Sequence, residues 1–222
     1  MGYLDEVWDY ARENHHEVWS GLREHVWLAL LPVLIALVLA LPLAWLIGRF
    51  GWLRQTILAV GSIVYTIPSL ALFLLLPGII GTGYLDPLNV VIALTLYSVA
   101  LLVRTTADAL ASVDDSVLQA ATAMGYRPAR QWFTVQLPLA LPVVFAGLRV
   151  ATVANVSMVS IAALIGLGGL GELFTRGFRL GFYTPPIVIG LLLTVALALV
   201  ADLLLVLLQR MLTPWSRVGV AR

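Results

Sequence analysis

Few side chains in this sequence have the type and position that chemistry would need, and the first group is three histidines near the N-terminus. His15, His16 and His25 lie in an acidic stretch and could form a metal site. Tryptophans recur around them, and indole rings favour the interface between membrane and water. We therefore expect the histidines to lie on a solvated face at the membrane surface, and we predict no metal site.

The absence of two residue types excludes several catalytic mechanisms. There is no cysteine, which excludes disulfides, thiolate catalysis and cysteine-bound metals. All 13 basic residues are arginine, and a chain without lysine forms neither a conventional P-loop nor a Schiff base. A membrane enzyme would also need clustered histidines or carboxylates within the membrane. The sequence predicts a chain that is not an enzyme, holds no cofactor and draws energy from another subunit; a scaffold or anchor is the remaining alternative.

Two ionisable residues lie within apolar segments, Arg149 and Asp202. An unpaired charge at the centre of a membrane helix costs about 2.5 to 3.5 kcal/mol on insertion scales. We hypothesise that these two side chains pair with each other or face polar groups of a partner.

The elements that position these residues are expected to be membrane helices. The chain is 61% hydrophobic and 11% charged, whereas a soluble domain has about 25% charged residues. Five apolar segments approach the length of about 20 residues that a crossing needs. They cover residues 26–47, 56–76, 88–103, 139–165 and 186–208. The predicted fold class is an all-α membrane protein with about five transmembrane helices.

The distribution of arginines predicts the orientation of the chain, since cytoplasmic loops are enriched in them. One set of alternating loops carries Arg49, Arg54, Arg104, Arg127, Arg130, Arg210, Arg217 and Arg222. The other set carries Arg12, Arg23, Arg176 and Arg179. We predict the N-terminus outside and the C-terminus in the cytoplasm. Residues 1–24 would then be an extracytoplasmic amphipathic segment, residues 25–210 the transmembrane domain and residues 211–222 a cytoplasmic tail.

The longest polar insertion between spans covers residues 104–138. Asp114 is a typical N-cap residue of a helix. Gly125 is typical of the left-handed residue that follows the C-terminal end of a helix. A second helical run is predicted to begin at Pro128. Large aromatic side chains of the kind that anchor interfaces follow at Tyr126 and Trp132.

Small residues occupy the first of these two predicted helices. Ala120, Ala121 and Ala123 would make one of its faces thin, which would permit close approach by a groove of another protein. The insertion is therefore predicted to be a segment that docks onto a partner.

The positions Gln119-Ala120-Ala121, Gly125, Val135 and Leu137-Pro138 resemble the EAA loop of the membrane subunits of binding-protein-dependent ABC importers. That loop reads Glu-Ala-Ala, three residues, Gly, nine residues, Ile, one residue, Leu-Pro. Gln119 replaces its glutamate and Val135 its isoleucine, so one charge is lost and the spacing is kept. The resemblance implies a type I importer transmembrane domain whose coupling loop, residues 108–138, docks in a groove of an ATPase subunit. The docking residues that it implies are Gln119, Ala120, Ala121, Gly125, Tyr126, Arg127, Arg130, Leu137 and Pro138.

Further segments are similar to one branch of this family, the osmoprotectant importers for glycine betaine, carnitine and choline. They are residues 65–72, 96–98, 103–104, 137–142, 146–149 and 165–172. The resemblance covers about residues 25–210 and implies a subunit that forms the translocation pathway for such a solute by ATP-driven alternating access. An importer of another small substrate, such as methionine or another amine, is the alternative.

Several residues are candidates for the pathway. Pro68 interrupts the second span, as a simple kink or as a broken helix that lines the pathway. The glycines of residues 166–171 would pack helices tightly or form a gate, and Glu172 beside them favours the gate. Polar residues in the fourth span could join helices or line the path. The candidates are Tyr65, Thr66, Pro68, Ser69, Tyr97, Asn155, Ser157, Gly168, Gly169 and Glu172, with packing the more expected role of the two tyrosines.

The resemblance also implies partners. These are two ATP-binding cassette subunits that bind ATP and Mg²⁺, a second permease subunit that is identical or related, and an extracytoplasmic substrate-binding protein. The chain would span a bacterial cytoplasmic membrane several times, and it shows no basic run that would indicate nucleic-acid binding.

Overall fold

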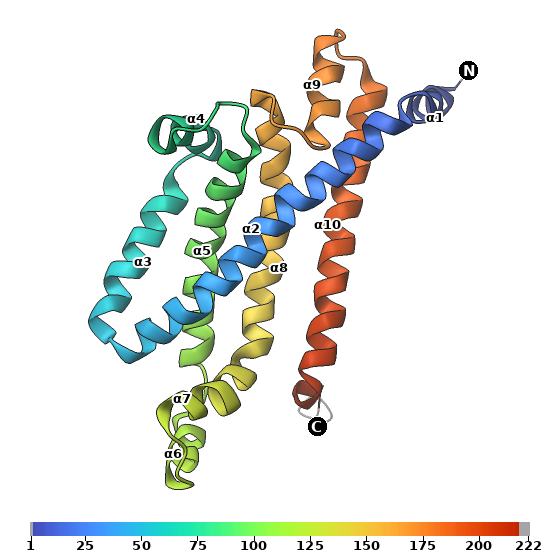
Figure 1. Ribbon diagram of the computed structural model, residues 1–222. Coiled ribbons are helices and arrows are strands. Elements are labelled where there is room, and N and C mark those ends of the chain that lie inside the picture. The colour runs from blue at the N-terminus through green and yellow to red at the C-terminus, as the bar shows by residue number, and fades with distance from the viewer. Residues whose placement is uncertain (1, 218–222) are drawn as a thin grey trace.

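The computed structural model describes residues 2–217, and all regular secondary structure in that range is helical (Figure 1). The longer helices are α1 (Tyr3–Glu13), α2 (His15–Arg49), α3 (Gly51–Thr66), α4 (Ser69–Ile80), α5 (Pro87–Ala111), α6 (Asp115–Ala123), α8 (Leu137–Ala162), α9 (Gly171–Arg179) and α10 (Thr184–Leu212). The short elements are α7 (Pro128–Gln131), a π-helical segment (Trp132–Gln136) and 3₁₀ turns at Ala163–Ile165 and Pro214–Arg217. Residues 218–222 of the predicted tail lie outside the described residues.

Within residues 2–217, four helical stretches are long and apolar enough to cross a membrane: α2, α5, the continuous run Pro128–Ile165, and α10. A fifth crossing is possible if α3 and α4 count as one bent span. The described termini lie at opposite ends of the bundle, with α4 and α9 at the N-terminal end and α6 at the C-terminal end (Figure 1). The prediction of an all-α membrane protein with about five crossings is confirmed.

The second predicted span is broken rather than kinked. α3 and α4 meet at Ile67 and Pro68 with a bend of 105°. Pro68 has no amide hydrogen to donate, and the residue before a proline avoids helical geometry. Ile67 accordingly has extended backbone angles, φ −68° and ψ 129°. As a result α4 lies across the end of the bundle instead of continuing through it (Figure 1).

The predicted N-terminal segment proves to be two elements. α1 ends at Glu13, and α2 begins at His15, well before the expected start of the first span. His15 and His16 are exposed, in agreement with the expected solvated face. His25 contradicts that expectation, because its side chain is completely buried in the bundle.

The core forms where α2 crosses α5 and α8. Ala29, Ala36, Ala40 and Ala44 line one side of α2 and are at most 1% exposed. Small residues let membrane helices approach closely, so that dispersion contacts hold them together. Gly147 serves the same purpose between α8 and α5: a Cβ atom there would overlap the side chain of Thr105.

The two intramembrane charges pair with each other, as hypothesised. Arg149 Nε donates to Asp202 Oδ1 at 2.6 Å, and Arg149 Nη2 donates to Asp202 Oδ2 at 2.7 Å. This bidentate geometry is the strongest arrangement of such a pair. It joins α8 to α10. Only 6% of the most apolar part of α10 is buried within the chain. The pair is therefore an important attachment of α10.

This pairing predicts a rescue. Asp202→Ala leaves the Arg149 guanidinium unpaired within the membrane and should lower the thermal stability of the chain. The swap Arg149→Asp with Asp202→Arg should recover most of that loss in thermal unfolding followed by size-exclusion chromatography in detergent. A swapped chain no more stable than the single variants would contradict this role.

Candidate functional site

The segment between α5 and α8 folds as a compact helical element with defined ends. The Asp114 carboxylate accepts a hydrogen bond from the backbone N–H of Ser116 at 2.8 Å and caps α6. The hydroxyl and the backbone N–H of Ser116 together lower the pKa of Asp114. At the other end Gly125 has φ +83°. Its N–H donates to the Thr122 carbonyl, and the N–H of Tyr126 donates to the Ala121 carbonyl. This is the Schellman ending expected from a glycine at this position.

Side chains of α7 and of the π segment connect α6 to the rest of the bundle. The Gln131 amide donates to the Leu118 carbonyl at 2.8 Å, and the Gln136 amide donates to the Leu110 carbonyl at 3.2 Å. The Arg130 guanidinium lies over the Tyr126 ring at 4.7 Å from its centroid. A force on α6 therefore reaches both α5 and the start of α8.

The exposed face of α6 differs from the predicted one. Ala121 is only 1% exposed, because α6 turns this residue toward α7 and the π segment. The prediction of Ala121 as a direct docking contact is thus wrong. Ala120 and Ala123 are exposed. A shallow groove of about 460 Å³ is lined by Asp115, Leu118, Gln119, Thr122, Ala123 and Gln131.

Three other residues that were predicted to contact a partner are instead buried or half-buried within the chain. Trp132, expected to anchor a partner, is 7% exposed and packs within the chain. Leu137 and Pro138 are half-buried at the start of α8. Arg127 is exposed at the start of α7 and can reach a partner.

The predicted pathway residues on α3 and α5 come together. Tyr65 packs edge-on against Tyr97, with ring centroids 5.8 Å apart. The Tyr97 hydroxyl donates to the Ile67 carbonyl, one of the groups left free by the helix break. Beside them runs a groove of about 250 Å³ lined by Leu58, Gly61, Ser62, Tyr65, Thr66, Ala100, Leu101 and Arg104. Pro68 is exposed and Ser69 half-buried at the break itself.

The predicted residues on α8 do not gather in that groove. The Asn155 side chain is 2% exposed. It accepts from the Ser98 hydroxyl at 3.1 Å and donates to the Ala29 carbonyl at 3.3 Å. It therefore joins three helices, which favours the packing alternative. Ser157 is exposed, and its hydroxyl donates to the Val153 carbonyl.

The glycine-rich turn at the N-terminal end of the bundle is held by α2. Gly168 and Gly169 have φ of +41° and +79°. The N–H of Gly169 donates to Glu24 Oε2 at 3.2 Å, and the N–H of Leu170 donates to His25 Nδ1 at 3.1 Å. Because Nδ1 is thus an acceptor, Nε2 carries the proton and donates to the Val156 carbonyl at 2.8 Å. We call this arrangement the Glu24–His25 latch.

Glu172 follows the turn in the first part of α9, a helix that the sequence did not predict. Burial raises the pKa of Glu172, and the Glu24 carboxylate raises it further. A cavity of about 340 Å³ lies beside it, lined by Glu17, Ala163, Gly166, Glu172, Thr175, Arg176 and Arg179. Arg176 in this lining forms an ion pair with Glu17.

Comparison with known proteins gives this architecture a family context. Residues 23–214 match the model of a family described as the binding-protein-dependent transport system inner membrane component. The osmoprotectant import permease protein OsmW of Salmonella typhimurium is 40% identical over 92% of this chain and 96% of its own length. The choline transport system permease protein OpuBD of Bacillus subtilis is 33% identical over 96% and 93%.

Solved structures share the fold at lower sequence identity. The inward-facing MetNI methionine ABC transporter matches with a TM-score of 0.82 at 21% identity, over 90% of this chain and 98% of that one. An amino acid ABC transporter crystallised with histidines matches with a TM-score of 0.75 at 20% identity, over 95% and 99%.

The latch makes a testable prediction. His25→Phe leaves the N–H of Leu170 and the carbonyl of Val156 without their partners in a buried site, so it should cost about 2 to 4 kcal/mol of stability. Thermal unfolding, together with hydrogen exchange at residues 169 and 170, measures the effect. His16→Phe is the matched control, since His16 is exposed. Equal losses in both variants would refute the latch.

The cap of α6 makes a second prediction. Asp114→Ala should speed hydrogen exchange in the first turn of α6 about fivefold, whereas Asp114→Asn should retain most of the protection. The folded pKa of Asp114 is lowered, so the cap contributes fully above the unfolded pKa. The part of its contribution that depends on the negative charge is lost as pH falls through the folded pKa. Protection that did not change at low pH, after correction for the intrinsic exchange rate, would argue against this cap.

Proposed function

This chain belongs to the family of binding-protein-dependent transport system inner membrane components, and we propose that its cargo is a compatible solute such as glycine betaine, carnitine or choline. It is a permease subunit of an ABC importer and is not catalytic; the ATPase is a separate subunit. The observation that carries the cargo class is the relationship to permeases named for these solutes, at 32 to 33% identity over most of the chain, and to the osmoprotectant permease at 40%.

The groove between α3 and α5 is compatible with this cargo. Quaternary ammonium groups are attracted to the faces of aromatic rings. Tyr65 is 44% exposed and lines the groove beside the hydroxyls of Ser62 and Thr66. Transient contact with one ring would guide a cation without holding it, as a pathway requires.

Energy enters, in this proposal, at the exposed face of α6. An ATPase subunit would hold the thin surface around Ala120 and Ala123 in a groove, with Gln119 as a hydrogen-bonding neighbour. ATP and Mg²⁺ would be bound by that partner. Gln131 connects α7 to α6, and Gln136 connects the π segment to α5. A displacement of α6 would therefore tilt the spans between inward and outward openings.

The orientation and the assembly follow from this docking. α6 lies at the cytoplasmic side, which places the N-terminus outside and the C-terminus inside. The pathway is formed with a second permease subunit, identical or related, above two ATPase subunits. An extracytoplasmic binding protein delivers the solute at the end that carries α4 and α9.

Transport by the reconstituted assembly tests the cargo. Proteoliposomes with the ATPase and the binding protein should accumulate labelled glycine betaine, carnitine or choline in an ATP-dependent manner, and should not accumulate methionine. Uptake of methionine alone would overturn the cargo class while leaving the family intact.

Gly125 provides a prediction with a built-in control. A Cβ atom there meets nothing within 4 Å, yet φ is +83°, so a substitution is harmful only through the left-handed backbone. Gly125→Val should lower transport at least tenfold, because β-branched residues are strained in this region. Gly125→Asn should keep most of the activity, since asparagine tolerates it. Equal uptake by the two variants, at matched membrane levels, would contradict the requirement for this turn.

A further inference from the structure

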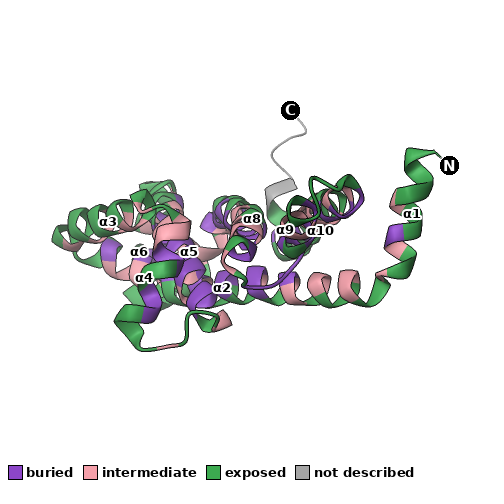
Figure 2. Cartoon of the chain, turned by 90° about the horizontal axis from the view of Figure 1, so that it is seen from above, coloured by how far each residue is buried: buried purple, intermediate pink, exposed green. Residues whose placement is uncertain are grey.

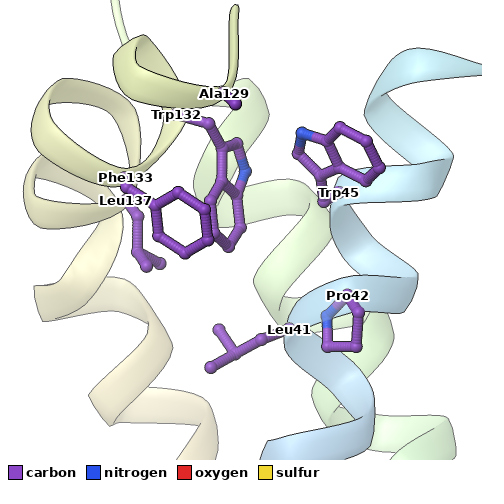
Figure 3. A pocket seen from close by; sticks show the side chains of 7 residues that line it. All are labelled: Leu41, Pro42, Trp45, Ala129, Trp132, Phe133 and Leu137. Carbon is purple, nitrogen blue, oxygen red and sulfur yellow. The ribbon is translucent and has the colours of Figure 1, made fainter.

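An apolar pocket lies between α2 and the end of the predicted coupling loop. We call this loop, residues 108–138, the docking element. Its volume is about 360 Å³, and it is lined by Leu41, Pro42, Trp45, Ala129, Trp132, Phe133 and Leu137. Figure 3 shows the α2 residues on one wall and the aromatic rings of Trp132 and Phe133 on the other. No polar or charged side chain lines the pocket except through the two indoles.

The π segment shapes the second wall. A π-helix turns less per residue than an α-helix, so residues five apart lie on nearly the same side. Trp132 and Leu137 are five apart and both line the pocket. Phe133 stacks edge-on against Trp132, at 4.6 Å between centroids, and is still 65% exposed. Such π segments occur frequently at functional sites.

A stripe of exposed apolar residues on α2 leads to the pocket. Leu31, Leu34 and Val38 are spaced three and four residues apart, and Val38 is 71% exposed. Pro42 and Trp45 continue the same spacing into the pocket. This spacing places all of them on one face of the helix. Figure 2 shows α2 along one side of the bundle.

Tryptophans mark the two ends of this stripe. Trp27 is 40% exposed, and it lies 18 residues before Trp45, which is about 27 Å along the helix axis. Because α2 runs obliquely across α5 and α8 (Figure 1), its rise along the membrane normal is shorter than this length. Tryptophan and arginine near the end of a membrane helix favour the interface with water, and Trp45 and Arg49 both lie in the last two turns of α2. This places the pocket near the interface.

Arg49 is a cation at the same end of α2 as the pocket. Arg49 follows Trp45 by one helical turn and is exposed. It makes no hydrogen bond or ion pair with any residue in the described range 2–217. The neighbouring Arg54, by contrast, pairs with Asp108 at 3.2 Å. A cation at headgroup level next to an apolar pocket complements a lipid with an anionic headgroup.

We propose that this pocket binds one acyl chain of an anionic phospholipid whose headgroup lies at Arg49. The lipid would belong to the leaflet on the side of α6. By filling the space between α2 and the π segment, it would hold the base of the docking element against the bundle.

Native mass spectrometry of the assembled transporter tests the proposal. After release from nanodiscs with equal amounts of phosphatidylglycerol and phosphatidylcholine, the wild-type assembly should retain phosphatidylglycerol with about a fivefold preference. Leu41→Trp places a large side chain in the pocket and should remove this retained lipid. Val143→Trp is the matched control, because Val143 is 46% exposed on α8 and does not line the pocket.

A second variant tests the headgroup separately, so the test does not depend on the stability of Leu41→Trp. Arg49→Gln should leave a lipid bound and abolish the preference for phosphatidylglycerol. Two results would overturn the proposal: no lipid retained by the wild-type assembly, as expected if another protein covers the pocket, or equal retention of the two lipids before and after Arg49→Gln.

Discussion

The close contact of α2 with α5 and α8 is the interaction on which the other features depend. It exists because Ala29, Ala36, Ala40 and Ala44 present almost no side chain at the crossing, so that the helices meet along most of the length of α2. This single helix therefore reaches both ends of the bundle. At one end its Glu24 and His25 hold the glycine turn, and at the other its Trp45 faces the base of the docking element.

Irregular backbone next to a membrane requires hydrogen-bond partners, since each unsatisfied group costs several kcal/mol in lipid. At the break after α3, the hydroxyl of Tyr97 satisfies the Ile67 carbonyl. At the glycine turn, the latch satisfies the amides of Gly169 and Leu170. The break after α3 and the glycine turn are thus specified by side chains of neighbouring helices, whereas the docking element is ended locally by Gly125. An element with local ends can keep its shape while the spans around it move.

This difference explains which features could be predicted from the sequence. The apolar segments, the glycine end of α6 and the break at Pro68 depend on residues close together in the chain. The pairing of Arg149 with Asp202 could also be hypothesised, because charge in lipid needs a partner. The role of His25 could not, since its partners lie 131 and 145 residues away. Ala121 and Trp132 were assigned to a docking face because helix spacing alone does not reveal which side α7 and the π segment cover.

The central claim is that the exposed side of α6 contacts the ATPase subunit, and thiol cross-linking tests it most directly. The chain has no cysteine, so Ala120→Cys, Ala123→Cys and Ala121→Cys each create a single reactive site. In the reconstituted assembly, positions 120 and 123 should cross-link to the ATPase subunit, and position 121, which faces the chain's own helices, should not. Cross-linking from position 121 alone, or from none of the three, would contradict the account.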